Sequence, residues 1–314
     1  MFNYLVTGAA GFIGSSVAKI LLKRGHRVVT IDNLSTGFRE AIPEGATFIE
    51  GNCQDVNVVQ QLNDYRFDAI LHIAGQSSGE ISFDDPVYDL QTNTQSTLLL
   101  MKYALKTGCK KFIYASTMSV YGDHPDRPVN EDAVTMPKSF YGVGKLASEH
   151  YMRIYQQHGI QATALRLFNV YGPGQNMANL RQGMVSIFLA QAIKNKHIHV
   201  KGSKDRYRDF IYIDDVVDAF LLFLDKKSDR GFYEVFNIST GIRTTIEQLI
   251  ELMKKMLPFE VFVKYEGSTP GDQFGIVGDP SKIMAQHGWK FLFALEKGLS
   301  AFVQWALNEA KDSI

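Results

Sequence analysis

The stretch Thr7–Gly14, TGAAGFIG, decides the fold of this chain. It places Gly8, Gly11 and Gly14 between the strand-like run YLVT and a helix-like segment. Glycines in such a loop let the backbone approach a pyrophosphate, and the N-terminus of the helix supplies N–H donors to it. Asp32 ends the next strand-like run, where an acidic side chain accepts hydrogen bonds from the ribose 2′-hydroxyl and repels a 2′-phosphate. The stretch therefore predicts a dinucleotide site that favours NAD over NADP.

Short apolar runs alternate with amphipathic stretches through the first half of the chain. The predicted strands are YLVTGA, RVVTID, TFIEGN, AILHIAG, KFIYAST and, further on, TALRLFNVYGP. The segment IGSSVAKILLKRG predicts a helix that Gly25 closes. Strands that alternate with helices imply parallel βαβ units, so we expect an α/β fold with a Rossmann-type doubly wound parallel sheet.

The second half of the chain alternates less regularly. RQGMVSIFLAQAIKNK and TTIEQLIELMKKML predict helices, and FEVFVKYE predicts a half-buried strand. We expect residues 1–167 to form an NAD-binding domain, with a segment around 209–238 returning to it. Residues 168–208 and 239–314 are expected to form a smaller mixed α/β lobe that binds the substrate.

Composition excludes several classes of protein. The chain has 314 residues, with 33 Lys and Arg against 33 Asp and Glu, so no basic excess points to nucleic acid or to an anionic membrane. No apolar run reaches the length of about 18 residues that a membrane span needs. Only two cysteines occur, Cys53 and Cys109, without metal-ligand spacing, so neither a metal site nor a disulfide framework is predicted. With no signal peptide at the start, we expect a cytoplasmic protein.

The stretch SFYGVGKLASEH places Tyr141 four residues before Lys145, on the same face of a predicted helix. Tyrosine has a pKa of about 10, so it is a poor base at neutral pH. A nearby ammonium favours the phenolate, and we expect Lys145 to lower the pKa of Tyr141. Such a tyrosine removes a hydroxyl proton while the carbon loses hydride, and Lys145 can also bond the ribose of a nicotinamide. Without the glycine loop the same spacing would indicate no more than a solvated helix face.

Further segments match one family in order. TGAAGFIG, DNLSTG, HIAGQSS, ASTMSVYGD, YGVGK, LRLFNVYGPGQ and RDFIYIDDVVDA resemble the extended branch of the short-chain dehydrogenase/reductase superfamily. That branch contains the NAD-dependent nucleotide-sugar epimerases and dehydratases, and the resemblance covers nearly the whole chain. It implies an isomerase, similar to the UDP-glucose 4-epimerases, that oxidises a sugar at C4 and returns hydride to the other face.

The resemblance also implies roles for individual residues. The catalytic residues are Tyr141, Lys145 and Thr117, with Thr117 preferred to Ser116 as the hydroxyl that orients the substrate. The cofactor-binding residues are Gly8, Ala10, Gly11, Phe12, Ile13, Gly14, Asp32, Asn33, Asn52, Cys53, Ala74, Asn93, Tyr141 and Lys145. The substrate-binding residues are Ser77, Thr117, Tyr141, Asn169, Arg208 and Asp272.

Three alternatives stay open at this point. A dehydratase is disfavoured because Met118 and Ser119 stand where family dehydratases have Asp-Glu. A reductase that consumes NADPH fits Asp32 less well, and a non-catalytic NAD-binding regulator fits poorly with both Tyr141 and Lys145 present.

Thr269 replaces a family arginine near the diphosphate, whose charge Lys204, Arg206 or Arg181 could supply. The resemblance further implies a homodimer, built on helices near Leu90–Leu105 and Tyr141–Gln157.

Overall fold

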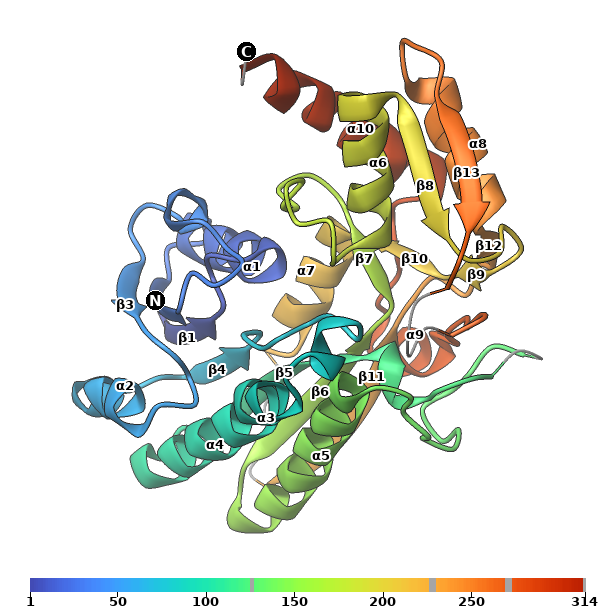
Figure 1. The fold of residues 1–314 in the computed structure, drawn as a ribbon. Coiled ribbons are helices and arrows are strands. Elements are labelled where there is room, and N and C mark those ends of the chain that lie inside the picture. The colour runs from blue at the N-terminus through green and yellow to red at the C-terminus, as the bar shows by residue number, and fades with distance from the viewer. Residues whose placement is uncertain (125–126, 226–229, 269–272, 313–314) are drawn as a thin grey trace.

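A seven-stranded parallel sheet forms the centre of the computed structural model, which describes residues 1–124, 127–225, 230–268 and 273–312 (Figure 1). The strand order is β11-β6-β5-β4-β1-β2-β3, and every neighbouring pair is parallel. The order reverses direction at β1, which is the doubly wound arrangement. The predicted Rossmann-type sheet is confirmed. Its strands are β1 (Asn3–Thr7), β2 (Arg27–Asp32), β3 (Thr47–Glu50), β4 (Ala69–His72), β5 (Lys111–Thr117), β6 (Gln161–Leu167) and β11 (Phe232–Ile238).

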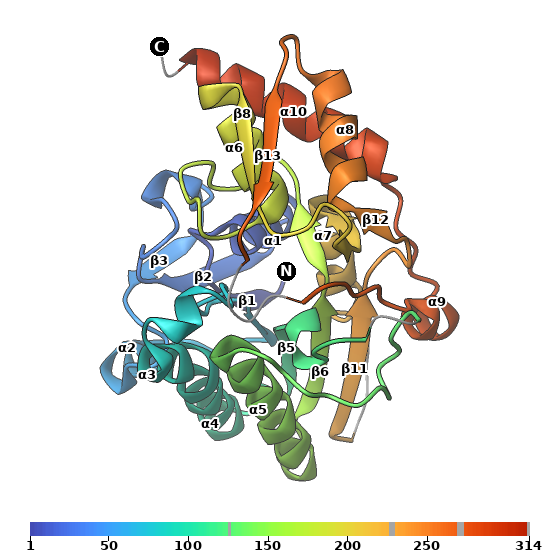
Figure 2. The ribbon, with the colours of Figure 1, turned by 45° about the vertical axis from the view of Figure 1, so that its right-hand side comes forward.

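Helices cover both faces of this sheet (Figures 1 and 2). Strand residues alternate between two apolar clusters, so that Val6 and Leu71 pack on one face while Leu5 and Ile70 pack on the other. The face of Val6 is covered by α1 (Phe12–Lys23) and α7 (Ile213–Leu222). The opposite face is covered by α2 (Val56–Gln60), α4 (Ser96–Thr107) and α5 (Phe140–Tyr155).

Most of the remaining elements lie above one end of the sheet in both views, whereas α9 lies beside β11 (Figures 1 and 2). Three small two-stranded sheets pair β10 with β7, β12 with β9 and β13 with β8. These elements are β7 (Asn169–Tyr171), α6 (Met184–Asn195), β8 (His197–Lys201), β9 (Tyr207–Arg208), β10 (Phe210–Tyr212), β12 (Thr244–Thr245), α8 (Ile246–Met256), β13 (Phe262–Glu266), α9 (Ser281–His287) and α10 (Leu295–Asp312). Short segments complete the described chain: α3 (Pro86–Leu90), a π-helical turn at Gln91–Gln95, and 3-10 turns at Arg39–Ala41, Gln61–Asp64, Ile81–Phe83, Met118–Val120 and Gln156–His158.

Two expectations about strands are corrected. TALRLFNVYGP forms two strands, because the backbone N–H of Phe168 donates to Ile238 while that of Asn169 donates to Asp209. The chain therefore leaves the main sheet after Phe168. The strand predicted from FEVFVKYE is mostly exposed, since Phe262 has 70% of its surface accessible at the edge of a two-stranded sheet.

His72, Cys53 and Cys109 are three buried side chains of the core. His72 is a satisfied core histidine, because its Nδ1 lies 2.8 Å from the Thr7 hydroxyl and its Nε2 lies 3.1 Å from the Ser96 hydroxyl. Cys53 and Cys109 are both buried and free. Within the described ranges, no helix combines the length and the apolar character that crossing a membrane requires.

Candidate active site

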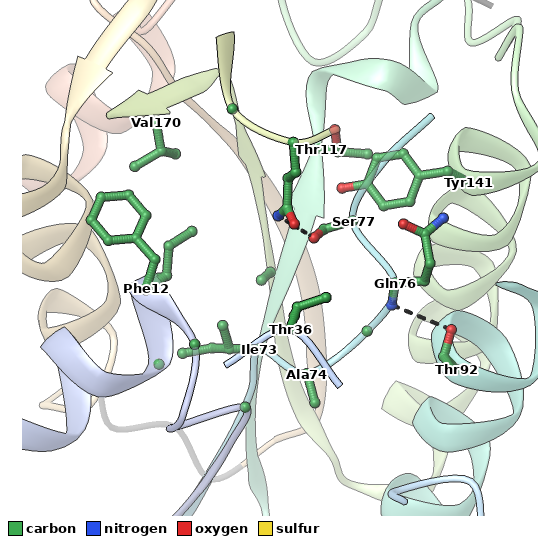
Figure 3. Close-up of a pocket in the computed structure, with 18 of the residues that line it drawn as sticks. Phe12, Thr36, Ile73, Ala74, Gln76, Ser77, Thr92, Thr117, Tyr141 and Val170 are labelled. Atoms are coloured by element: carbon green, nitrogen blue, oxygen red, sulfur yellow. Dashed lines mark hydrogen bonds between the residues drawn. The ribbon is translucent and has the colours of Figure 1, made fainter. Parts of the chain in front are cut away.

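A cavity of about 470 Å³ opens at the carboxyl ends of the sheet strands, where loops from β1 to β6 meet (Figure 3). Open α/β sheets bind ligands at this edge, next to the point where the strand order reverses. Most residues predicted for the site line this cavity. They are Gly8, Gly11, Phe12, Ile13, Gly14, Asp32, Asn33, Asn52, Cys53, Ala74, Ser77, Thr117, Tyr141, Lys145 and Asn169.

The glycine loop forms one wall of the cavity. Gly8 has a φ of +78°, which L side chains rarely adopt. A Cβ on Gly14 would lie 2.1 Å from the carbonyl oxygen of Gly8, so only glycine lets the start of α1 approach the loop this closely. The N-cap residue of α1 is Gly11, which has no side chain to accept hydrogen bonds from the first N–H groups of the helix. The first N–H groups of α1 therefore remain open toward the cavity, where an anion would accept hydrogen bonds from them.

Asp32 is held at the end of β2 by two backbone donors. Its Oδ2 accepts a hydrogen bond of 2.9 Å from the N–H of Ala10, and its Oδ1 accepts one of 2.9 Å from Leu34. A carboxylate has about four lone-pair sites, so two remain for a ribose. Next to it, the amide of Asn33 donates to Asn52 Oδ1 at 2.7 Å. Ala10 does not line the cavity, and its contribution in this structure is to fix Asp32.

The predicted tyrosine and lysine face the same cavity from α5. Lys145 Nζ donates to the carbonyl of Ala115 at 2.9 Å and lies 5.8 Å from the centre of the Tyr141 ring. Tyr141 points toward Thr117, which ends β5 (Figure 3). A base, a cation and a second hydroxyl therefore meet at one point of the cavity wall.

The expected effect of Lys145 on the pKa of Tyr141 is wrong for this structure. Burial raises the pKa of Tyr141 to about 12, the Thr117 hydroxyl acts against this shift, and the charge of Asp89 adds to it. Burial also lowers the pKa of Lys145 to about 8, which weakens its effect as a cation, although Asp89 opposes that shift. The sequence pattern placed the two side chains correctly but carried no information on how deeply they are buried.

The two neighbouring hydroxyls at the end of β5 have different partners. Ser116 donates to the carboxylate of Glu149, whereas Thr117 donates to the Ser119 hydroxyl at 3.2 Å and accepts from the Ser119 N–H at 3.1 Å. Both residues reach the cavity wall. The Thr117 hydroxyl therefore lies beside Tyr141, whereas the Ser116 hydroxyl is bonded to Glu149.

Asn93 does not line the cavity, although the sequence placed it among the cofactor residues. It lies fully buried in the π-helical turn, and its Nδ2 donates to the carbonyl of Gln76 at 2.9 Å and to Asp89 at 3.2 Å. Its Oδ1 has no hydrogen-bond partner among the described residues. Asn93 thus holds the loop after β4, which supplies Ala74, Gln76 and Ser77 to the cavity.

A second cavity of about 300 Å³ adjoins the first and is lined by several cations. Arg208 is buried there and donates to the carbonyls of Tyr207 and Gln273, both at 2.7 Å. Of the cations considered as replacements for the family arginine, Arg181 and Arg206 line this cavity, while Lys204 does not and instead pairs with Glu247 at 2.8 Å. Lys138 and Lys201 also line it. Asp272 and Thr269 lie outside the described residues.

Uncharged residues form the junction between the two cavities. The residues that line both are Ser77, Gly79, Met118, Ser119, Asn169, Gln182, Gly183 and Met184. The Gln182 amide donates to Ser77, which ties the segment before α6 to the loop after β4 (Figure 3). Sequence reasoning missed Gln76 and Gln182, along with Thr36 and Thr92. In the sequence, only their positions after predicted strands or in loops pointed to the site. Many other polar residues share such positions, so these four could not be told apart from them.

The first cavity fits NAD. The N-terminus of α1 has no side-chain cap and can bind a pyrophosphate. The start of α1 lies so close to the glycine loop that a Cβ on Gly14 would not fit. The buried carboxylate of Asp32 can accept hydrogen bonds from a ribose. Among the described residues, no group of three or more His, Cys, Asp or Glu side chains could hold a metal ion. The wall formed by Tyr141, Lys145 and Thr117 therefore places a phenol, an ammonium and a hydroxyl next to a cavity that fits a dinucleotide.

Comparisons with known proteins agree with this geometry. A family model described as the NAD dependent epimerase/dehydratase family matches residues 4–239. The chain is 31% identical over 314 residues to a UDP-glucose 4-epimerase from Mycolicibacterium smegmatis, covering 98% of this chain and 99% of that protein. Among solved structures, a UDP-glucose 4-epimerase from Thermotoga maritima with UDP-glucose has a TM-score of 0.91 and 34% identity, covering 98% of this chain and 99% of that one. A UDP-glucose 4-epimerase from Thermus thermophilus in complex with NAD has a TM-score of 0.89 and 32% identity, covering 97% of this chain and 99% of that one.

Proposed function

Because the chain belongs to the NAD dependent epimerase/dehydratase family, we propose that it is an NAD-dependent epimerase acting at C4 of a UDP-linked sugar. The observation that carries this proposal is the meeting of Tyr141, Lys145 and Thr117 at the wall of a cavity that fits NAD. The relatives named above act on UDP-glucose, and two of them were solved with the substrate or the cofactor that this site would hold.

In this proposal each side chain has one task. The Tyr141 oxygen accepts the proton of the C4 hydroxyl and later returns it, while the Thr117 hydroxyl orients the same oxygen. Lys145 is fixed by Ala115 and presents its ammonium to the side on which a nicotinamide ribose would lie. NAD, when bound, supplies the oxidant that takes a hydride from C4 and gives it back. The glycine loop and Asp32 bind the dinucleotide, and Asn52 offers an amide to an adenine edge.

Epimerisation requires the oxidised sugar to present its other face before it is reduced. The junction between the cavities suits such a turn, because small and flexible uncharged residues line it. Met118 and Ser119 form part of this junction and offer no carboxyl group for elimination of water. These features support an epimerase rather than a dehydratase.

We also propose that the sugar is neutral. None of the described residues that line both cavities carries a charge. A carboxylate on the sugar would therefore lose its hydration there without finding a cationic side chain to pair with. The cations lie in the second cavity, where Arg181, Arg206 and Arg208 suit a diphosphate. Asn169, which lines both cavities, would bond the substrate between the two groups.

The test is an NMR assay of the anomeric protons with UDP-glucose, UDP-N-acetylglucosamine and UDP-glucuronic acid, first without and then with added NAD. We expect the galacto isomer from one or both neutral substrates and little turnover of the glucuronate. An accumulating 4-keto product would instead indicate a dehydratase, and absence of turnover with every substrate would overturn the proposed activity.

Asp32 is expected to set the choice of dinucleotide. Replacing Asp32 with alanine removes the charge that repels a 2′-phosphate, so we expect the affinity for NADP to rise while that for NAD falls by about 10-fold. Titration calorimetry of cofactor-free protein with each dinucleotide measures both changes. Glu50→Ala is the matched control, because Glu50 ends the neighbouring strand β3 but does not line the cavity. Unchanged NADP binding in D32A would contradict the assignment.

We propose a homodimer that buries the outer surface of α3, α4 and α5. Large apolar side chains are exposed on these helices, including Val87, Leu90, Leu105, Val143 and Ile154. The three helices pack side by side at the bottom of both ribbon views, so these exposed residues belong to neighbouring helices (Figures 1 and 2). Exposed apolar side chains gathered on neighbouring helices support a protein interface.

The dimer predicts a specific response to charge. Ile154→Arg is expected to give a monomer by light scattering at micromolar concentration, since the arginine would be buried without a partner. Phe262→Arg serves as the control, because Phe262 is equally apolar and more exposed but lies on β13, away from these helices. A monomeric wild-type protein would contradict the dimer.

Two further proposals complete this picture. Residues 1–167 with a returning segment around 209–238 would form the cofactor half, and residues 168–208 and 239–314 the substrate lobe. The pairing of β11 with β6, and the position of Lys201 and Arg206 on the second cavity, support this division.

A cytoplasmic location is consistent with two free, buried cysteines, and fractionation of the source cells tests it.

A further inference from the structure

A buried ion pair lies behind the proposed active site. Glu149 on α5 and Arg166 on β6 meet through two hydrogen bonds, of 3.0 Å to Oε1 and 2.7 Å to Oε2. Their side chains are only 2% and 6% accessible. A buried pair of this kind is weak evidence for stability, because the loss of hydration offsets the attraction. Its position therefore calls for another explanation than stability alone.

The ion pair is bonded to the segment that carries the substrate-orienting hydroxyl. Ser116, the residue before Thr117, donates to Glu149 Oε1. Five residues later, the ring of Tyr121 lies 4.7 Å from the guanidinium carbon of Arg166. The short segment between these two contacts supplies Thr117, Met118 and Ser119 to the cavity wall.

The same ion pair also fixes the helix that carries the base. Tyr141, Lys145 and Glu149 follow one another at intervals of one helical turn along α5, so they share one face. Glu149 accepts hydrogen bonds from three strands of the sheet: Ser116 on β5, Arg166 on β6 and, at 3.3 Å, the Tyr233 hydroxyl on β11. The contacts from Ser116 and Arg166 hold α5 against β5 and β6, and with it the Tyr141 oxygen, whereas the bond from Tyr233 is the longest of the three and leads to a strand that carries no predicted site residue.

We propose that Glu149 and Arg166, acting through Ser116, are positioning residues that fix the Thr117 hydroxyl relative to the Tyr141 oxygen. This inference rests on the proposed epimerase activity and adds a role for groups that touch neither substrate nor cofactor. A displacement of about 1 Å between reacting groups can cost about 100-fold in rate. A rigid, buried link between strand and helix is therefore as important for the reaction as the two hydroxyls.

The structure offers a matched pair of variants. Ser116→Ala and Tyr233→Phe each remove one hydroxyl that donates to the same carboxylate, but only Ser116 adjoins the catalytic segment. We expect Ser116→Ala to lower kcat about 10- to 100-fold with little change in KM. Tyr233→Phe is expected to keep kcat within about 2-fold of the wild type, although both variants lose similar stability. Equal kcat losses in both variants would show that the effect does not run through the segment that carries Thr117, and would overturn the proposal.

Crystal structures of the two variants provide a readout that does not depend on turnover. We expect Thr117 to shift relative to Tyr141 in S116A and to stay in place in Y233F. An unmoved Thr117 together with a lower kcat would mean that Ser116 acts on the substrate directly, which also overturns the proposal. If the wild-type chain epimerises no UDP-sugar, the proposed function fails, while the position of Thr117 in these two structures still decides the positioning role.

Discussion

Replacing Tyr141 with phenylalanine is expected to lower kcat by about 10²–10⁴-fold while the protein keeps its fold and its bound cofactor. The change removes the oxygen that we propose accepts the proton of the C4 hydroxyl, and that range is the usual contribution of a positioned acid or base. The ring remains, so the buried wall of the cavity keeps its volume. KM is expected to change little, since the cations proposed to bind the diphosphate lie in the second cavity.

The control for Y141F is another buried tyrosine away from the site. Tyr103 on α4 donates its hydroxyl to the carbonyls of Leu62 and Tyr65, both at 3.1 Å, and it does not line either cavity. Tyr103→Phe is expected to lower the melting temperature slightly and to leave kcat unchanged. Comparable kcat losses in the two variants would show that the effect of Y141F is not chemical.

The pH dependence of the wild type gives a second test of Tyr141. Burial raises the pKa of Tyr141 to about 12, which favours the protonated phenol at neutral pH. The positive charge that NAD brings beside the ring favours the phenolate and lowers that pKa. We expect kcat/KM of the holoenzyme to rise with pH up to the lowered pKa, and this rise to be absent in Y141F. A profile that Y141F shares with the wild type would exclude Tyr141 as the titrating base.

Features that depend on neighbouring residues in the sequence could be predicted. The glycine loop, Asp32 and the Tyr141–Lys145 pair each rely on a short spacing within one loop or helix, and all of them reach the predicted cavity. The parallel sheet could also be predicted, from the alternation of strands and helices along the chain. Right-handed crossover connections leave few ways to join such strands. The family resemblance supplied the residue roles, which the variants at Tyr141, Asp32 and Gly14 test.

Features that depend on distant contacts could not be predicted. Nothing local shows that Gln182 bonds Ser77 across the cavity, or that Ser116 bonds Glu149. The break after Phe168 has the same origin, since it follows from the donation of Asn169 to Asp209, a residue in a later part of the chain. Burial is also a property of the whole fold, which is why the direction of the Tyr141 pKa shift was wrong.

Gly14→Ala is expected to weaken NAD binding by about 100-fold or more. The added Cβ would lie 2.1 Å from the carbonyl oxygen of Gly8 and 2.5 Å from its carbon, both backbone atoms that no side-chain rotation can move. The start of α1 must then move away from the loop, and the N–H groups of Phe12 and Ile13 move with it. Losing two hydrogen bonds to a charged pyrophosphate costs about 3 kcal/mol, which is about 100-fold in Kd.

Gly108→Ala separates this loss from a general loss of stability. Gly108 has a φ of +77°, which L side chains rarely adopt, but an added Cβ would meet nothing within 4 Å, and the residue caps α4 away from the cavity. We expect G108A to lower the melting temperature and to keep a full complement of NAD, whereas G14A loses NAD even where circular dichroism shows a folded chain. The measurement is the amount of NAD released per chain after denaturation, followed by calorimetric titration of the stripped protein. Full NAD occupancy in a folded G14A would mean that the pyrophosphate does not lie on this loop, and the cofactor would then need another binding mode in the cavity.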